Sequence, residues 1–183
     1  MTSDDVVEYV KKQLTEWDYE DVVRAARGRC KLGAFILASC LIDHLAYFYS
    51  PIGNKNSGSG PRFKSFVSVY LRRYNDKKLY KALRCHLVHN YSEGGSYLFT
   101  HDRPNLHLQR DSKSGKSFVN LEDFLGEIQA AMVQFFDDAK RGGTAKGNSG
   151  RDVNIRDNIV KRFSDTGICG LVPAIPSDPR SKL

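Results

Sequence analysis

The chain has 183 residues, 40% of them hydrophobic, which is enough for one domain with a hydrophobic core and a tail. Its 28 basic and 21 acidic side chains give a net charge of +7, a balance that favours polyanionic partners. The four cysteines contain no C-x-x-C pair, which argues against a disulfide framework and favours a reducing compartment. A cytoplasmic protein is therefore expected.

Three helices are expected in the first half of the chain. Apolar residues at helical spacing predict the first over about residues 3–27. The second, over about residues 29–49, is apolar nearly all round, which predicts the central helix of a bundle. Asp43 and His44 interrupt it, which argues against a membrane span. Glycine and serine then predict a loop, and Pro61 suits the start of the third helix.

A fourth helix, which Asp76 can cap, is predicted to end near Tyr91. Short runs of strand-forming residues follow it at about 97–100, 106–109 and 117–119. They predict a small antiparallel β-hairpin insertion between the fourth helix and the next one.

Asn120 can cap a last strong helix that ends near residue 142, where two glycines follow. The sequence thus predicts a mainly α fold, a bundle of four to five helices in residues 1–142 with the hairpin inserted at about 96–119. Residues 143–183 are predicted to hold a flexible linker, a short helix and a proline-rich tail.

Arg84 is out of place in the fourth predicted helix. At about 100° per residue it falls within an apolar face that includes Leu83 and Leu87. A buried guanidinium is costly unless it is paired, so the position predicts a carboxylate partner or an anionic ligand. Five residues on, His89 leaves the helix about 140° around from Arg84, and Tyr91 returns to the arginine's side.

This R-x4-H-x-Y pattern resembles the motif of the HEPN superfamily, helical domains that include many ribonucleases of toxin and defence systems. The sequence from Leu83 to His89 resembles the typical motif helix, although Cys85 stands where a polar residue, often Asn, is common. The resemblance implies a homodimer with facing motif helices and metal-independent RNA cleavage, with Arg84 and His89 catalytic. The final tyrosine resembles the toxins that are paired with a nucleotidyltransferase antitoxin, and it implies that Tyr91 is a modification target.

The residues themselves fit this chemistry. In RNA cleavage without a metal, the ribose 2′-hydroxyl attacks the adjacent phosphate, which requires a proton acceptor, a proton donor and positive charge. His89 can transfer protons and Arg84 can supply the charge; because one histidine does not easily act as both acid and base, a two-fold dimer makes chemical sense. Asp43, the only acid in its apolar helix, is the best partner for Arg84 and would orient it. The alternative is that Asp43 faces a loop at the end of the bundle.

Basic residues are concentrated just before Arg84, with a single acid, Asp76, among them. Such a cationic segment next to the motif helix favours contact with phosphates, and the alternative is an ordinary solvated helix face. The candidate RNA-binding residues are Arg72, Arg73, Lys77, Lys78 and Lys81.

Three further patterns are weaker. His86 and His89 with Cys85 lack the additional ligands of a zinc site, so we expect neither a metal nor a cofactor. The triplet 115–117, Gly-Lys-Ser, lacks the rest of a phosphate-binding loop and predicts a hairpin turn. The terminal Ser181-Lys182-Leu183 matches a peroxisomal address only in a eukaryote, and nothing else in the chain favours that compartment.

The leading hypothesis is therefore a dimeric, metal-independent endoribonuclease of the toxin or defence type. The alternative is a HEPN-like module that binds RNA or nucleotides without catalysis, in which case Cys85 marks its loss. A third option is a regulatory partner of a nucleotidyltransferase. The expected partners are RNA, a second copy of the chain and a nucleotidyltransferase-type antitoxin; no membrane partner is expected.

Overall fold

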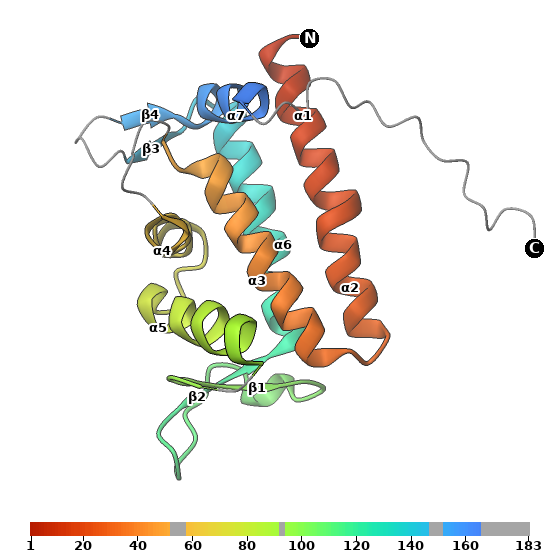
Figure 1. Cartoon of the computed structure of the whole chain (residues 1–183), viewed down its shortest axis with the longest axis vertical. Helices are drawn as coiled ribbons and strands as arrows, with labels where there is room; N and C mark the ends of the chain where they lie inside the picture. The colour runs from red at the N-terminus through yellow and green to blue at the C-terminus, as the bar shows by residue number, and fades with distance from the viewer. Residues whose placement is uncertain (52–57, 92–93, 147–151, 166–183) are drawn as a thin grey trace, which may run out of the picture.

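The computed structural model describes residues 1–51, 58–91, 94–146 and 152–165. A long helical stretch opens the fold: α1 (Ser3–Gln13), the π-helical η1 (Leu14–Tyr19) and α2 (Glu20–Arg27) follow one another without a loop (Figure 1). Thr2 caps it, since its hydroxyl accepts a hydrogen bond from the Asp5 amide at 3.2 Å while the Asp5 carboxylate accepts one from the Thr2 amide at 2.6 Å. The predicted first helix is confirmed, with a π-helical stretch inside it.

The central helix of the bundle is α3 (Lys31–Tyr49), as predicted from its apolar sequence. It runs beside α6 (Leu121–Lys140) in the same direction, while α1 and α2 run the opposite way (Figure 1). By length and composition α3 could cross a membrane, but more than half of its apolar window is buried inside the bundle. The mainly α fold expected from the sequence is confirmed.

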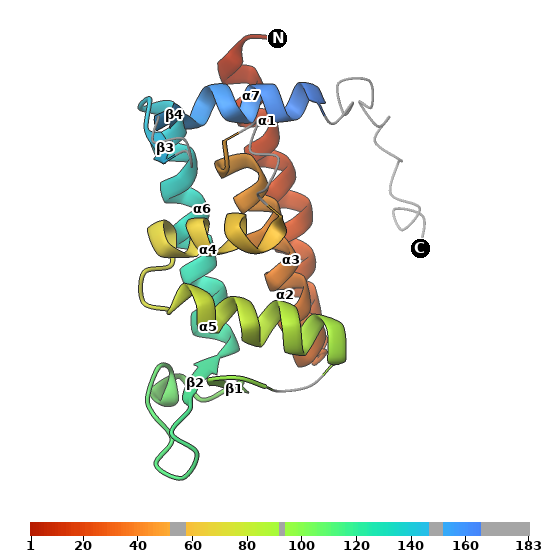
Figure 2. The same ribbon diagram turned by 60° about the vertical axis from the view of Figure 1, so that its left-hand side comes forward.

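Two shorter helical segments lie across these long helices (Figure 2). The first is α4 (Ser59–Tyr70), and the second consists of α5 (Asp76–Tyr80) continued by the π-helical η2 (Lys81–Val88). Asn75, rather than Asp76, caps the second, because its side-chain oxygen accepts a hydrogen bond from the Lys78 amide at 2.9 Å. An aromatic cluster joins the layers, formed by Tyr49, Phe66, Tyr70 and Phe135.

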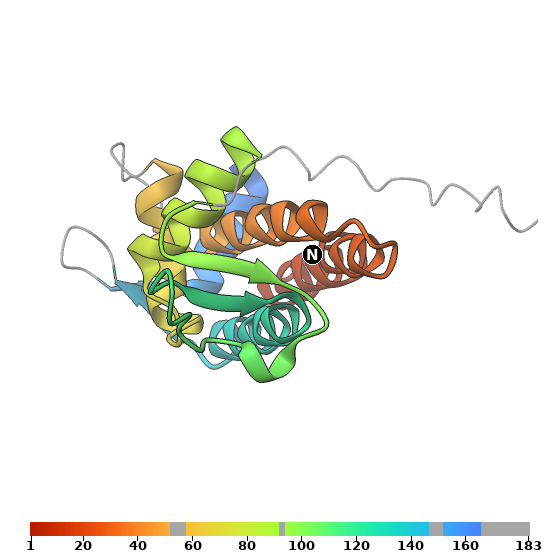
Figure 3. The same ribbon diagram turned by 90° about the horizontal axis from the view of Figure 1, so that it is seen from below.

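The insertion after η2 differs from the prediction. Strand β1 (Tyr97–Thr100) pairs with β2 (Ser117–Asn120) in parallel, and both lie across the lower end of the bundle (Figure 3). The prediction of an antiparallel hairpin over 96–119 is therefore wrong for these strands. The segment between them, residues 101–116, is long enough for the crossover connection that parallel pairing requires. Residues 106–109 contain no strand; a 3-10 turn, η3 (Pro104–Leu106), begins this crossover.

Antiparallel backbone pairing does occur at the predicted turn around residues 115–117, where Arg110 and Ser117 form an isolated β-bridge. The Phe118 amide also donates to the Gln109 carbonyl at 2.9 Å, and the Leu108 amide donates to the Phe118 carbonyl at 2.8 Å. Strand β2 therefore has this turn on one edge and β1 on the other.

The packed unit continues past residue 142, where the helical domain was predicted to close. The expected flexible linker contains β3 (Thr144–Lys146), which pairs antiparallel with β4 (Asp152–Asn154), while residues 147–151 lie outside the described part. Helix α7 (Ile155–Asp165) follows and packs on α1 and α3. Its buried Asn158 donates to the carbonyls of Phe48 and Ser50 at 2.6 and 2.8 Å, which fastens α7 to the end of α3. The predicted proline-rich tail lies outside the described residues.

Candidate functional site

The segment that carries the R-x4-H motif is π-helical from Lys81 to Val88. A π-helix closes its hydrogen bonds from residue i to i+5, so each turn holds more residues than the 3.6 of an α-helix. The five-residue step from Arg84 to His89 is therefore nearer to one full turn than it would be in an α-helix. The predicted offset of about 140° between the two side chains is too large. Short π-helical segments are frequent at functional sites, which draws attention to this stretch.

Arg84 pairs with Asp43 of α3, as predicted. Its Nη2 lies 3.0 Å from Oδ2 of Asp43, and each side chain keeps 19% of its surface exposed. The Sγ of Cys40, one turn earlier on α3, lies 4.0 Å from the other guanidinium nitrogen, Nη1. The arginine is thus held from one side by α3 and still reaches solvent on the other.

Asp43 lies in an environment that opposes its charge. Burial raises the pKa of this carboxyl above its usual value, and the charges of Arg84 and Arg62 lower it to a lesser extent. Its Oδ1 is buried and has no hydrogen-bond partner among the described residues. Because Oδ2 is the carboxylate oxygen that contacts Arg84 and Oδ1 has no partner among these residues, the ion pair with Arg84 is the main contact that keeps Asp43 charged.

His89 and Tyr91 are both exposed at the end of the motif helix. Tyr91 has a φ of 49° and leaves 62% of its surface in solvent. It was expected on the buried side with Arg84, and that was wrong, because the backbone turns into the left-handed region at Tyr91 and helical spacing no longer applies. The half-buried Cys85 follows Arg84 on the π-helical segment.

His86 is held by packing. A Cβ at Gly94 would lie 2.4 Å from Cγ of the His86 ring, so the backbone of Gly94 passes directly over the imidazole. Among the described residues, no three His, Cys, Asp or Glu side chains gather closely enough to hold a metal ion. His86 of the motif helix therefore packs against Gly94, which follows that helix.

Gly94→Ala is expected to lower the free energy of unfolding by about 1–3 kcal/mol, because the added methyl group must displace the His86 ring. Gly126→Ala is the matched control: no atom lies within 4 Å of its Cβ position inside α6, and alanine should raise the stability by about 1 kcal/mol. Urea unfolding of both variants measures the difference. A Gly94→Ala variant as stable as the native chain would contradict the close contact.

The cationic residues predicted to bind RNA divide into two groups. The guanidinium of Arg73 forms an ion pair with Glu127 of α6, and Arg72 donates from Nε to the Val69 carbonyl at 2.8 Å. The exposed lysines of the α5–η2 helix are in no ion pair with a described residue; they are Lys77, Lys78 and Lys81. The lysines are therefore the more available part of this basic segment.

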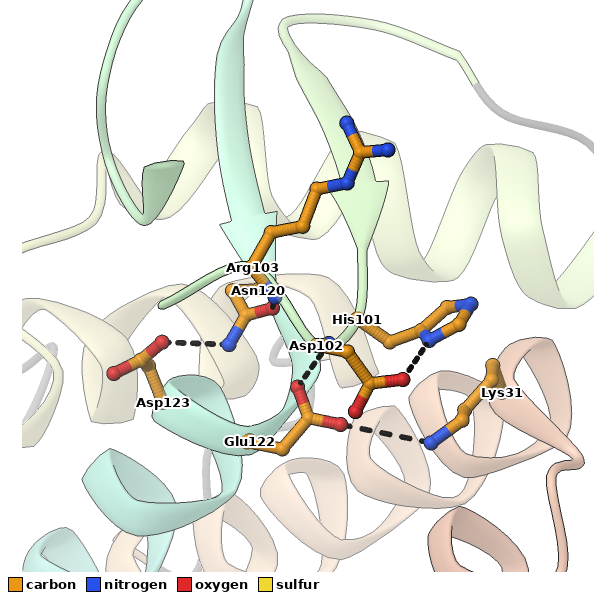
Figure 4. Close-up of polar contacts among 7 residues, drawn as sticks. All are labelled: Lys31, His101, Asp102, Arg103, Asn120, Glu122 and Asp123. Carbon is orange, nitrogen blue, oxygen red and sulfur yellow. Dashed lines mark hydrogen bonds and ion pairs between the residues drawn. The ribbon is translucent and has the colours of Figure 1, made fainter. Parts of the chain in front are cut away.

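A polar cluster that sequence reasoning missed lies where the chain leaves β1 (Figure 4). One carboxylate oxygen of Glu122 accepts from the Asp102 amide at 3.0 Å, and the other lies 3.6 Å from Nζ of Lys31. His101 Nδ1 lies 2.7 Å from the Asp102 carboxylate, and this hydrogen bond holds the pKa of Asp102 below its usual value. Residues from three separate segments meet here, so local sequence patterns gave no signal.

The buried Asn120 completes this cluster. It was predicted to cap α6, but its side chain makes other contacts: its oxygen accepts from the Arg103 amide at 3.0 Å, and its nitrogen donates to the Asp123 carboxylate at 2.6 Å. The side chain of Arg103 points away from the other labelled groups in Figure 4. The cluster thus ties the turn after β1 to the start of α6, and a structural role accounts for its contacts.

Comparison with models of known protein families, with curated proteins and with solved structures gives no match to this chain.

Proposed function

We propose that the protein is a metal-independent endoribonuclease of the HEPN type, whose active site is completed by a second copy of the chain. The observation that carries this proposal is the Arg84–Asp43 ion pair at 3.0 Å, next to solvent, on a π-helical segment that ends in the exposed His89. A structural arginine needs no solvent contact, whereas a phosphate-binding one does. The partly exposed guanidinium, oriented by Asp43, has the latter arrangement.

The chemistry requires a positive charge at the phosphate and two proton transfers. His89 of one protomer accepts the proton of the ribose 2′-hydroxyl, whose oxygen then forms a bond to the adjacent phosphorus. Arg84 stabilises the negative charge that develops on the phosphate oxygens. The bond to the 5′-oxygen breaks, and that oxygen takes a proton from the protonated His89 of the second copy. The products are a 2′,3′-cyclic phosphate and a 5′-hydroxyl.

The surface around Arg84 supports docking of a second copy. Cys40, next to the guanidinium, is exposed, and Leu37 lies one turn away on the same side of α3 with 39% of its surface in solvent. The exposed Leu37 gives the face around Cys40 apolar area to bury in an interface. In a two-fold dimer, each motif helix would lie close to its symmetry mate.

Tyr91 supports the expected link to a nucleotidyltransferase. Its side chain is 62% exposed at the end of the motif helix, so its hydroxyl is accessible to a modifying enzyme. A nucleotide attached there would add negative charge and bulk two residues from His89, which would hinder RNA and dimer contacts. The proposed regulation therefore acts on the active-site face.

Incubation of the purified protein with single-stranded RNA in EDTA tests the function. We expect cleavage that the chelator leaves unchanged, with 2′,3′-cyclic phosphate on the upstream fragment, because the proposed steps need no metal. End-specific phosphatase and ligase treatments identify the product ends. Binding of RNA with no cleavage of varied substrates would instead support the non-catalytic module.

A further inference from the structure

A cationic cavity lies away from Arg84, between the start of α5 and the turn that precedes β2. It has a volume of about 630 Å³, is open to solvent, and is lined by four basic residues and no acidic one. The basic residues come from three parts of the chain and are Arg73, Lys78, Arg110 and Lys116. Arg73 and Lys78 belong to the basic segment predicted to bind RNA, whereas Arg110 and Lys116 lie on a turn far from the motif helix in the sequence.

Three of the four basic residues have no ion-pair partner in the described part of the chain. Arg73 pairs with Glu127, but Lys78, Arg110 and Lys116 form no ion pair with any described residue. Basic side chains that converge on one cavity raise the positive potential there, which favours the binding of an anion. The cavity therefore has the electrostatics of an anion site.

The turn that forms the outer wall is internally fixed. Asp111 accepts hydrogen bonds from the amide and hydroxyl of Ser114 at 2.7 and 2.6 Å, so its charge is engaged within the turn. Arg110 donates from Nε to the Gly115 carbonyl at 2.9 Å, which leaves its other N–H groups available. Gly115 has a φ of 68° and no side chain, which lets the Arg110 guanidinium come this close. A Cβ at Gly115 would lie 3.3 Å from Nη2 of Arg110. The guanidinium is thus held in place before any ligand binds.

The cavity is connected to the candidate active site by one helix. Lys78 precedes Arg84 by six residues on the continuous α5–η2 segment, so less than two helical turns separate them along its axis. A strand whose scissile phosphate lies at Arg84 and which follows this helical segment can therefore place a phosphate a few nucleotides away in the cavity.

We propose that this cavity binds backbone phosphates of single-stranded RNA a few nucleotides from the scissile bond. The identity of the polyanion rests on the proposed ribonuclease function, whereas the anion site itself rests on the cavity. Arg110 and Lys116 make the contacts, and Lys78 links them to the motif helix.

Binding of a fluorescent single-stranded oligoribonucleotide to full-length His89→Ala protein, measured by anisotropy at several salt concentrations, tests this proposal. Lys116→Gln in that background should weaken binding about threefold and reduce the slope of log affinity against log salt by about 0.7, the value for one lost phosphate contact on a single strand. Lys113→Gln, which removes an equal charge from the same turn outside the cavity, should leave both quantities unchanged.

Equal effects of Lys116→Gln and Lys113→Gln, or no RNA binding, would overturn the proposal. ATP serves as a second probe: if it binds in a Lys116-dependent manner while RNA affinity ignores Lys116, the cavity belongs to a free nucleotide and the RNA assignment is wrong. Binding is measured without cleavage, so the two proposals can fail separately. If the native protein cleaves RNA but Lys116→Gln leaves the salt dependence of RNA binding unchanged, the cavity proposal alone is refuted. If Lys116→Gln reduces that salt dependence but the native protein never cleaves RNA, the catalytic proposal alone is refuted.

Discussion

His89→Ala is expected to lower the rate of RNA cleavage by about 10²- to 10⁴-fold, the usual contribution of a positioned proton-transfer group. The histidine is exposed at the end of η2, so its removal should change the free energy of unfolding by less than about 0.5 kcal/mol. Initial cleavage rates and thermal unfolding of the same preparation measure the two effects. A large loss of activity in a fully folded protein would assign the loss to chemistry.

His101→Ala is the matched control for this experiment. His101 is also exposed, but it lies beside Asp102 in the cluster after β1 and has no place in the proposed chemistry. Its replacement should leave the cleavage rate unchanged. If His89→Ala cleaves RNA as fast as His101→Ala does, His89 is not the proton-transfer group.

Asp43→Ala is expected to lower the free energy of unfolding by about 3 kcal/mol, because it leaves the Arg84 guanidinium largely buried without its carboxylate. The value lies at the lower end of the range for buried pairs, since 19% of the Arg84 side chain still contacts water. Cleavage should also fall, because Asp43 no longer orients the arginine. Chemical unfolding measures the first effect and the cleavage assay the second.

Two comparisons show whether this loss comes from the pair. Asp21→Ala removes an exposed aspartate that pairs with Arg24 on the surface, and it should cost less than about 1 kcal/mol. Adding Arg84→Met to Asp43→Ala should recover much of the lost stability, because no buried charge then remains unpaired. Equal stabilities of Asp43→Ala and Asp21→Ala would mean that Arg84 does not depend on Asp43.

The helices were predictable because their signals are local. The spacing of apolar residues located α3 and α6 to within a few residues. Because α3 has no polar face, it was identified as the central helix. The parallel pairing of β1 with β2 was not predictable, since the sequence of a strand does not state the direction of its partner. The packing of α7 on α1 and α3 was missed for a similar reason: a short amphipathic helix does not reveal what its apolar face covers.

The candidate site was predictable in part. Arg84 and Asp43 were found because a charge in an otherwise apolar helix requires a partner, and each helix offered one such charge. The π-helical geometry of η2 and the charge of Arg62 near Asp43 depend on tertiary packing, which apolar spacing does not record. The cationic turn with Arg110 and Lys116 was missed because its partners across the cavity are about 30 to 40 residues away in the sequence.

The proposed active site contains two copies of His89, and mixed dimers provide the sharpest test of this composite arrangement. Wild-type protein and His89→Ala are mixed in equal amounts, allowed to exchange subunits, checked for dimers by light scattering and assayed for cleavage. Random pairing leaves about a quarter of the dimers with both histidines, so the mixture should retain about a quarter of the wild-type activity at equal total protein. Retention of about half, or an active particle that is strictly monomeric, would show that each chain acts alone and would contradict the composite site.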